Sequence, residues 1–227
     1  MRYSTFLALV VAGATLSGCG VAGNGDVTAT EHGANTINGS IHVPAGLHSA
    51  TLGTVNGSIA IDDNATVGTA STVNGSIDMG AHATASSLTT VNGGVTVGSE
   101  SRVEHSVTTV NGTMNMHSGA DVGGKLENVN GHIVLNAAHV AGGLRTVGGD
   151  IDISGASHVE GGIHVEKSNS WFNLESRKPR IVIGPGAVVQ GELRFDREVQ
   201  LYVSEQATVG PISGATAVRF SGDRPPG

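Results

Sequence analysis

Short runs of alternating apolar and polar residues recur along most of this chain. In one unit, Met114 and Met116 are followed by Ala120 and Val122 and then by Leu126, with polar residues or glycine between them. An alternation of period two over such short runs predicts half-buried β-strands rather than helices. Since three such runs occur in the unit, we expect three short strands in it.

Units of this kind repeat at a nearly constant length. Successive Asn-Gly pairs lie 18 or 19 residues apart, and Gly148-Gly149 continues the series. One unit cannot bury its apolar face alone, so repetition at this period predicts coils stacked on one another. We therefore expect an all-β fold over residues 24–215. It would be a single-stranded parallel β-helix, or β-solenoid, with three short strands in each coil of 18–19 residues and about nine coils.

The repeat is interrupted once before it ends. The pattern lapses at Ser168 and resumes at Arg180, so residues 168–180 are expected to be an insertion loop. Residues 216–227 follow the last full coil and are expected to form a C-terminal cap or tail.

The Asn-Gly pairs are predicted to be corners of the coil. Both residue types tolerate positive φ, where β-branched residues do not fit. Stacking would place each asparagine above the previous one, so that side-chain amides could bond along the axis. The expected ladder consists of Asn38, Asn56, Asn74, Asn92, Asn111 and Asn130.

The start of the chain has the features of an export signal. Arg2 supplies a positive charge, and residues 6–15 form an apolar stretch of the length found in signal peptides. That stretch is too short to cross a bilayer, which needs about 20 apolar residues. Leu16-Ser17-Gly18-Cys19 resembles the lipobox of bacterial lipoproteins, in which the cysteine is diacylated and becomes the mature N-terminus.

The lipobox resemblance implies how the chain is processed and where it is located. We expect a signal peptide over residues 1–18, lipidation of Cys19, and a lipidated tether over residues 19–23 that holds the protein at a membrane. Gly20, rather than Asp, follows the cysteine. By resemblance to the sorting rule of enterobacterial lipoproteins, this favours the outer membrane of the cell envelope.

Charge and cysteine content exclude some classes of partner. Removal of residues 1–18 leaves 11 basic and 19 acidic side chains, a net charge of −8. An acidic body argues against nucleic acid, which requires a basic surface. Cys19 is the only cysteine, so an internal disulfide is impossible.

Two classes of repeat protein share the coil chemistry. Residues 183–193, Ile-Gly-Pro-Gly-Ala-Val-Val-Gln-Gly-Glu-Leu, resemble the coils of bactofilins, which are filament-forming right-handed β-helices. The Val-Asn-Gly-Ser-Ile repeats resemble exported adhesin-like β-strand repeat proteins. The bactofilin resemblance implies self-assembly, although bactofilins typically lack a signal sequence.

A third resemblance leaves the direction of coiling open. Ile61, Val67 and Val73 follow one another at hexapeptide spacing, which resembles the left-handed β-helix of some acyltransferases. Those enzymes carry no lipobox, and we favour a right-handed coil over a left-handed one.

Candidate catalytic and metal-binding residues are few. His139 and His158 fall near the same offset on successive coils, with His164 and Glu160 nearby, and two histidines with a carboxylate can hold zinc. We favour solvated histidines on a strand face. Asp78 and Asp152 share an offset but lie four coils apart, too far for paired acid–base work. We therefore expect no catalytic residue, no metal and no cofactor, and a protein that is not an enzyme.

The insertion loop is the candidate binding region. It contains the only tryptophan and a basic cluster in an otherwise acidic chain. Loops on rigid scaffolds often carry binding residues, and tryptophan with arginine suits a contact to a sugar or a partner. An alternative is that the aromatic residues cover a face of the solenoid. The candidate residues are Trp171, Phe172, Arg177, Lys178 and Arg180.

Together these patterns favour a non-enzymatic cell-envelope lipoprotein that acts as a rigid scaffold or binding rod and can self-assemble. Its expected partners are the membrane through Cys19, a cell-wall or surface polymer, and further copies of itself. The alternatives are an adhesin or glycan-binding module that uses residues 168–180 and, less favoured, a carbohydrate-active or acyl-transfer enzyme.

Overall fold

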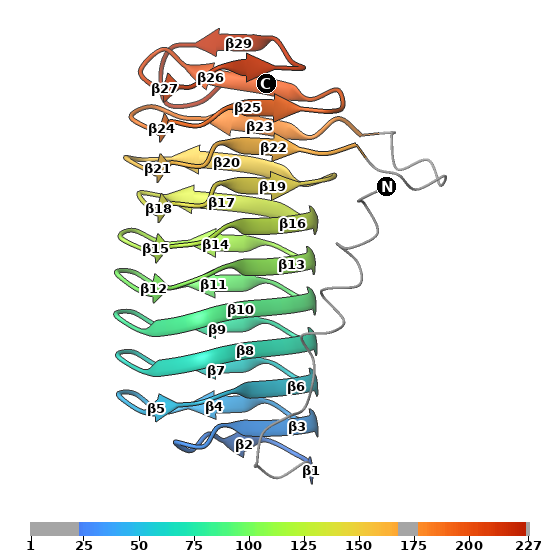
Figure 1. Ribbon diagram of the computed structural model, residues 1–227, viewed down its shortest axis with the longest axis vertical. Coiled ribbons are helices and arrows are strands. Elements are labelled where there is room, and N and C mark those ends of the chain that lie inside the picture. Colours follow the sequence, from blue (N-terminus) through green and yellow to red (C-terminus); the bar gives the residue numbers. More distant parts are fainter. Residues whose placement is uncertain (1–22, 168–176, 226–227) are drawn as a thin grey trace.

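The structure is a computed structural model that describes residues 23–167 and 177–225. It is all-β over these residues, and the chain winds into a solenoid of about ten turns with a repeat of about 18 residues. The turns are stacked into a rod that runs from β1 to β29 (Figure 1). The predicted β-solenoid is thus confirmed, and the right-handed coil stays a prediction.

Each turn contributes one strand to a parallel sheet of 11 strands, which we call face I. Neighbouring strands of this sheet come from successive turns, and the chain adds β29 as the last of them. The strands are β2 (Val27–Thr28), β4 (Ile41–Val43), β7 (Ile59–Ile61), β9 (Ile77–Met79), β11 (Val95–Val97), β14 (Met114–Met116), β17 (His132–Asn136), β20 (Asp150–Ser154), β23 (Arg180–Ile183), β26 (Gln200–Ser204) and β29 (Ala217–Phe220).

The other two sides of the coil, faces II and III, belong to one sheet of 18 strands. Two long strands, β8 (Thr66–Asn74) and β10 (Thr84–Asn92), run through both sides and join them. Face II also contains β5 (His48–Ser49), β12 (Arg102–Val103), β15 (Asp121–Val122), β18 (His139–Val140), β21 (His158–Val159), β24 (Val188–Val189) and β27 (Thr208–Val209). Face III also contains β1 (Gly23–Asn24), β3 (Ala34–Asn38), β6 (Leu52–Asn56), β13 (Val107–Asn111), β16 (Leu126–Asn130), β19 (Leu144–Thr146), β22 (Ile163–Val165), β25 (Leu193–Phe195) and β28 (Ile212–Ser213).

The core is a column of aliphatic side chains inside the rod. Met114 and Met116 from face I, Val122 from face II and Leu126 from face III are at most 1% exposed. The same positions are buried in the turns above and below, because parallel pairing places each inward residue over its equivalent. Burying each such side chain contributes about 1.5–3 kcal/mol relative to leaving it in water.

The glycines at the corner between faces III and I allow successive turns to pass each other closely. A Cβ added at Gly75 would lie 2.0 Å from the carbonyl oxygen of Gly57, and one added at Gly57 would lie 1.9 Å from that of Gly39. The φ of Gly57 and of Gly75 is outside the left-handed range. Tolerance of positive φ was therefore the wrong reason for these glycines: close contact between backbones requires them.

Two columns of polar side chains connect the turns beside this corner. In the first, Asn74 Nδ2 donates to Asn56 Oδ1 at 2.9 Å, and the exposed ladder runs from Asn24 to Asn130. In the second, which is buried, Thr72 Oγ1 donates to the carbonyl oxygen of Gly57 at 2.9 Å. The ladder donors are Asn38, Asn56, Asn74, Asn92, Asn111 and Asn130, with distances of 2.8–3.4 Å.

Positive φ is found at a different corner, between faces I and II. One residue in each of eight successive turns has φ between 49° and 76° there. Half of these residues are not glycine, so the turn itself imposes this conformation on side chains that rarely adopt it. The eight are Gly46, Asn64, His82, Glu100, Gly119, Ala137, Gly155 and Gly186.

We expect Gly75→Ala to destabilise the solenoid by about 3 kcal/mol or more, because the added methyl group overlaps rigid backbone. Gly46→Ala is the matched control. It adds the same methyl group at φ +71° with no atom within 4 Å, so only the left-handed backbone strain of about 1 kcal/mol should appear. Urea unfolding followed by far-ultraviolet circular dichroism measures both variants. Equal losses would contradict the close-contact explanation.

Candidate functional site

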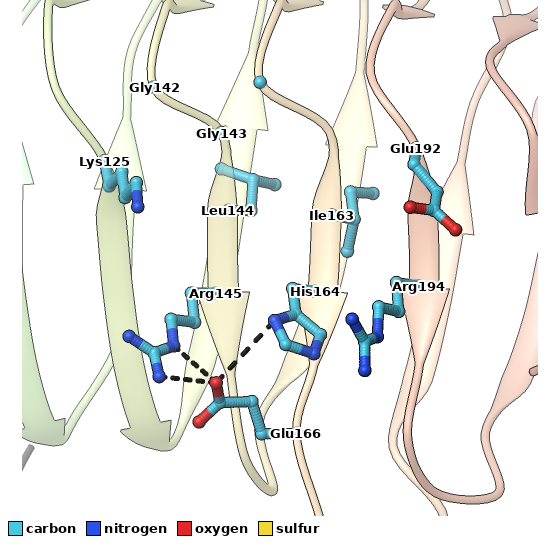
Figure 2. Close-up of a pocket in the computed structure, with 11 residues that line it drawn as sticks. Lys125, Gly142, Gly143, Leu144, Arg145, Ile163, His164, Glu166, Glu192 and Arg194 are labelled. Carbon is cyan, nitrogen blue, oxygen red and sulfur yellow. Dashed lines mark hydrogen bonds and ion pairs between the residues drawn. The ribbon is translucent and has the colours of Figure 1, made fainter. Parts of the chain in front are cut away.

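A pocket of about 380 Å³ opens on face III and is lined by residues of four neighbouring turns. The lining begins at Lys125, just before β16, and continues through β19 and β22 to β25 (Figure 2). Glycines form part of its floor. Gly143 and Gly162 occupy the two middle turns of a row whose outer members are Lys125 and Glu192. Between the lysine and the glutamate, Gly142, Gly143 and Gly161 contribute only backbone to the lining.

Two arginines and a histidine form a second row across the pocket. Arg145 pairs in register with His164, and His164 with Arg194, on β19, β22 and β25. Neighbouring strands lie about 4.8 Å apart, which sets the spacing of the row. The three side chains point the same way from adjacent strands (Figure 2). Their exposed fractions are 30%, 33% and 58%, so ligands in solvent can reach them.

Carboxylates fix the first two members of the row. Arg145 Nε donates to Glu166 Oε1 at 2.8 Å, and Glu127 Oε1 lies 3.6 Å from Arg145 Nη1. His164 Nδ1 lies 3.6 Å from the same Glu166 oxygen. One carboxylate therefore lies beside an arginine and a histidine of successive turns.

A second carboxylate holds the other end of the row. Asp196 Oδ2 lies 2.8 Å from His164 Nε2, and Asp196 Oδ1 accepts from Arg194 Nε at 2.9 Å. The hydrogen bond from His164 and then that from Arg194 lower the pKa of Asp196, against an opposing effect of desolvation. The row is thus a continuous chain of ion pairs across three turns.

The outer members of the glycine row differ from the paired cations. Lys125 is exposed, and among the described residues it forms no ion pair with a carboxylate. Glu192 accepts a hydrogen bond from Ser213 Oγ at 2.7 Å. The pocket therefore offers an available cation at one end, a carboxylate at the other, and a fixed row of Arg145, His164 and Arg194 beside them.

The histidine cluster expected from the sequence is only partly assembled. His139 and His158 are vertical neighbours on face II, with ring centroids 5.8 Å apart. The grouping of His164 with them was wrong, because it lies on β22 of face III, in the pocket. Within residues 23–167 and 177–225, no three histidine, cysteine or acidic side chains are placed to hold a metal ion.

His139 lies between two carboxylates of different turns. Its Nδ1 is 2.6 Å from Asp121 Oδ1, and its Nε2 is 3.1 Å from Glu160 Oε1. The hydrogen bond to Asp121 is the main cause that raises the pKa of His139 above 6.5; desolvation opposes it, and Glu160 adds to the increase. Arg102 pairs with the same Asp121. Protonated His139 therefore links three successive turns.

The basic residues predicted to bind a partner contact the solenoid itself. Arg177 pairs with Asp150, whose Oδ1 also accepts from the backbone nitrogen of Arg180 at 2.8 Å. Lys178 Nζ lies 2.8 Å from Glu198 Oε2. The Arg180 guanidinium lies 5.2 Å from the centre of the Tyr202 ring. These contacts fasten the chain to the rod where the repeat resumes.

Three of the other expected site residues, Cys19, Trp171 and Phe172, lie outside the described residues. Comparison with known protein families, curated proteins and solved structures finds no match. In the part of the chain that the structure describes, no helix is long and apolar enough to cross a membrane.

We expect His139→Gln to weaken the solenoid at acidic but not at alkaline pH. Because the folded protein raises the pKa of His139, the stabilisation is fully present below 6.5 and is lost as the pH rises through the folded value. The difference in urea midpoint between wild type and variant should be larger at about pH 5.5 than at about pH 8.5. His158→Gln, which removes the neighbouring imidazole, is the control. A pH-independent difference for His139→Gln would refute the linkage.

Proposed function

We propose that this protein is a non-enzymatic lipoprotein of the cell envelope whose solenoid serves as a rigid scaffold and binding rod. The observation that carries the proposal is the continuous stacking of parallel turns from β1 onward. Only a few residues separate the first of these strands from Leu16-Ser17-Gly18-Cys19. A rod on a short lipidated tether would hold its outward side chains close to a membrane.

The contacts between turns support the scaffold role. Backbone pairing fixes each turn to the next, and the asparagine ladder and buried threonines add contacts between the turns up to Asn130. Outward side chains are therefore held at a constant spacing of about 4.8 Å along the axis. His139 and His164 each lie between carboxylates of different turns, an arrangement that uses them to join turns. Such a surface is suited to holding an extended partner.

We expect Cys19→Ser to abolish acylation and to release the protein from the membrane fraction. The sulfur of Cys19 would carry the diacylglycerol, and the serine hydroxyl cannot take its place. Incorporation of a labelled fatty acid and fractionation of cells measure the two effects. Ser17→Ala, which keeps a small residue before the cysteine, should remain acylated. If Cys19→Ser carries no fatty acid and still stays in the membrane fraction, the lipid on Cys19 is not what holds the protein at the membrane.

Self-association at the C-terminal end is a second candidate function. Val209 and Ile212 on the last turn are partly exposed, whereas their equivalents Val189 and Leu193 on the preceding turn are fully buried. β27, β28 and β29 each pair with a strand on one side only. Open strand edges over an apolar interior favour the addition of another chain.

Assembly of the Cys19→Ser protein should increase with concentration and should be lost in the further variant Ile212→Lys, which places a charge on the open end. Val218 lies on the same turn but is 50% exposed on its outer surface. Val218→Lys is therefore the control and should still assemble. Sedimentation velocity measures the size distribution. A monomer at every concentration would eliminate this second function.

A further inference from the structure

We infer that the pocket on face III binds an acidic polysaccharide, a polymer that carries carboxylates and many hydroxyl groups. The polymer would lie along the rod axis, across β19, β22 and β25. This inference deepens the proposed function and rests on it for the presence of a polymer partner, whereas the binding chemistry rests on the pocket alone.

The shape of the pocket suits an extended polymer. Its lining comes from four neighbouring turns, so its length follows the axis of the rod. Gly143 and Gly161 line it with backbone alone between Lys125 and Glu192. A sugar ring can approach this backbone closely, because neither glycine has a side chain. Both glycines are also required by the fold, since an added Cβ would lie 2.8 Å and 2.5 Å from the nearest backbone atoms.

The two arginines of the row and Lys125 match a ligand with repeated negative charges. Arg145, His164 and Arg194 follow one another at the strand spacing of about 4.8 Å. Lys125 adds a cation that pairs with no carboxylate among the described residues. A carboxylate that reaches Lys125 forms a new ion pair without breaking an existing one, which makes the lysine the first point of attachment.

Carboxylates in the same pocket select among polyanions. Glu166 and Glu192 line it together with the cations, so its total charge is small. They accept hydrogen bonds from hydroxyl groups and repel closely spaced phosphates. The whole chain carries a net charge of −7, which adds to that repulsion. A polymer with one carboxylate per sugar and free hydroxyls has widely spaced negative charges and donors for the pocket carboxylates. Polyphosphate and nucleic acid have closely spaced phosphates instead.

The ion pairs also prepare the row for binding. Glu166 fixes Arg145, and Asp196 fixes His164 and Arg194, before any ligand is present. Side chains held in one orientation lose less conformational entropy on binding than free ones. The inter-turn ion pairs therefore serve the fold and the site together.

The test measures binding of polygalacturonate by the full-length protein in detergent. Lys125→Ala should weaken binding about tenfold, the effect of losing one charge-assisted contact. Arg194→Gln, at the other end of the row, should have a similar effect. Lys178→Ala removes the same charge from the region of residues 168–180, where Lys178 pairs with Glu198, and should bind as wild type. Binding should weaken as salt is added.

Three outcomes would overturn the assignment. Lys125→Ala and Arg194→Gln could both bind as wild type; neutral dextran could bind as tightly as polygalacturonate; or polyphosphate could bind equally well. A loss with Lys178→Ala alone would favour residues 168–180 as the binding region instead. Failure of acylation at Cys19 would refute the lipoprotein proposal but leave this site intact, because the binding measurement does not depend on the lipid.

Discussion

The close approach of successive turns at the corner between faces III and I is the constraint on which the rest of the structure depends. Backbone passes backbone there with no room for a Cβ, as the 2.0 Å clash at Gly75 demonstrates. That contact brings Thr72 within hydrogen-bond distance of the Gly57 carbonyl and places Asn74 over Asn56. Once the turns are in register at this corner, parallel pairing places every inward aliphatic residue over its equivalent, and the core forms as a continuous column.

The same register arranges the outward side chains in columns, so that charged residues 18 to 32 positions apart become neighbours. These columns are unevenly distributed along the rod. Residues 3–101 contain no lysine or arginine, and all 11 lysines and arginines other than Arg2 lie between Arg102 and Arg224. The longer ion-pair chains, around His139 and along the pocket row, therefore lie in the later turns, which Figure 1 shows toward the C-terminal end. The solenoid provides the same scaffold throughout, and the sequence places the lysines and arginines of the scaffold only from Arg102 onward.

The alternation of apolar and polar residues was sufficient to predict the fold and the burial of positions such as Met114 and Leu126. A short run that alternates in this way indicates a half-buried β-strand. Position in the repeat could not show why Gly75 is a glycine, because close contact and positive φ both select that residue. The positive φ of Ala137 and Glu100 carries no signal in residue type. The row of Arg145, His164 and Arg194 could not be predicted from the sequence for a different reason. His164 and Arg194 are 30 residues apart across the insertion, so counting offsets along the chain does not bring them together, although they pair in the sheet.

The places where the repeat departs from its own pattern coincide with the candidate site. The buried threonine column is interrupted by Asn128, which donates to the Gly112 carbonyl but leaves Oδ1 as the one buried side-chain polar atom without a partner among the described residues. Thr146, buried at the next position, accepts from the backbone nitrogen of Gly149. The asparagine ladder ends at Asn130 with its longest contact, 3.4 Å, and Gly148 occupies the next position. Glu127, at the start of the ion-pair chain, lies on this same turn. Contacts between charged side chains also join turns within the ladder, as at Arg102 and Asp121, but beyond Asn130 they continue without it. The region where the regular contacts stop is thus the region that contains the pocket.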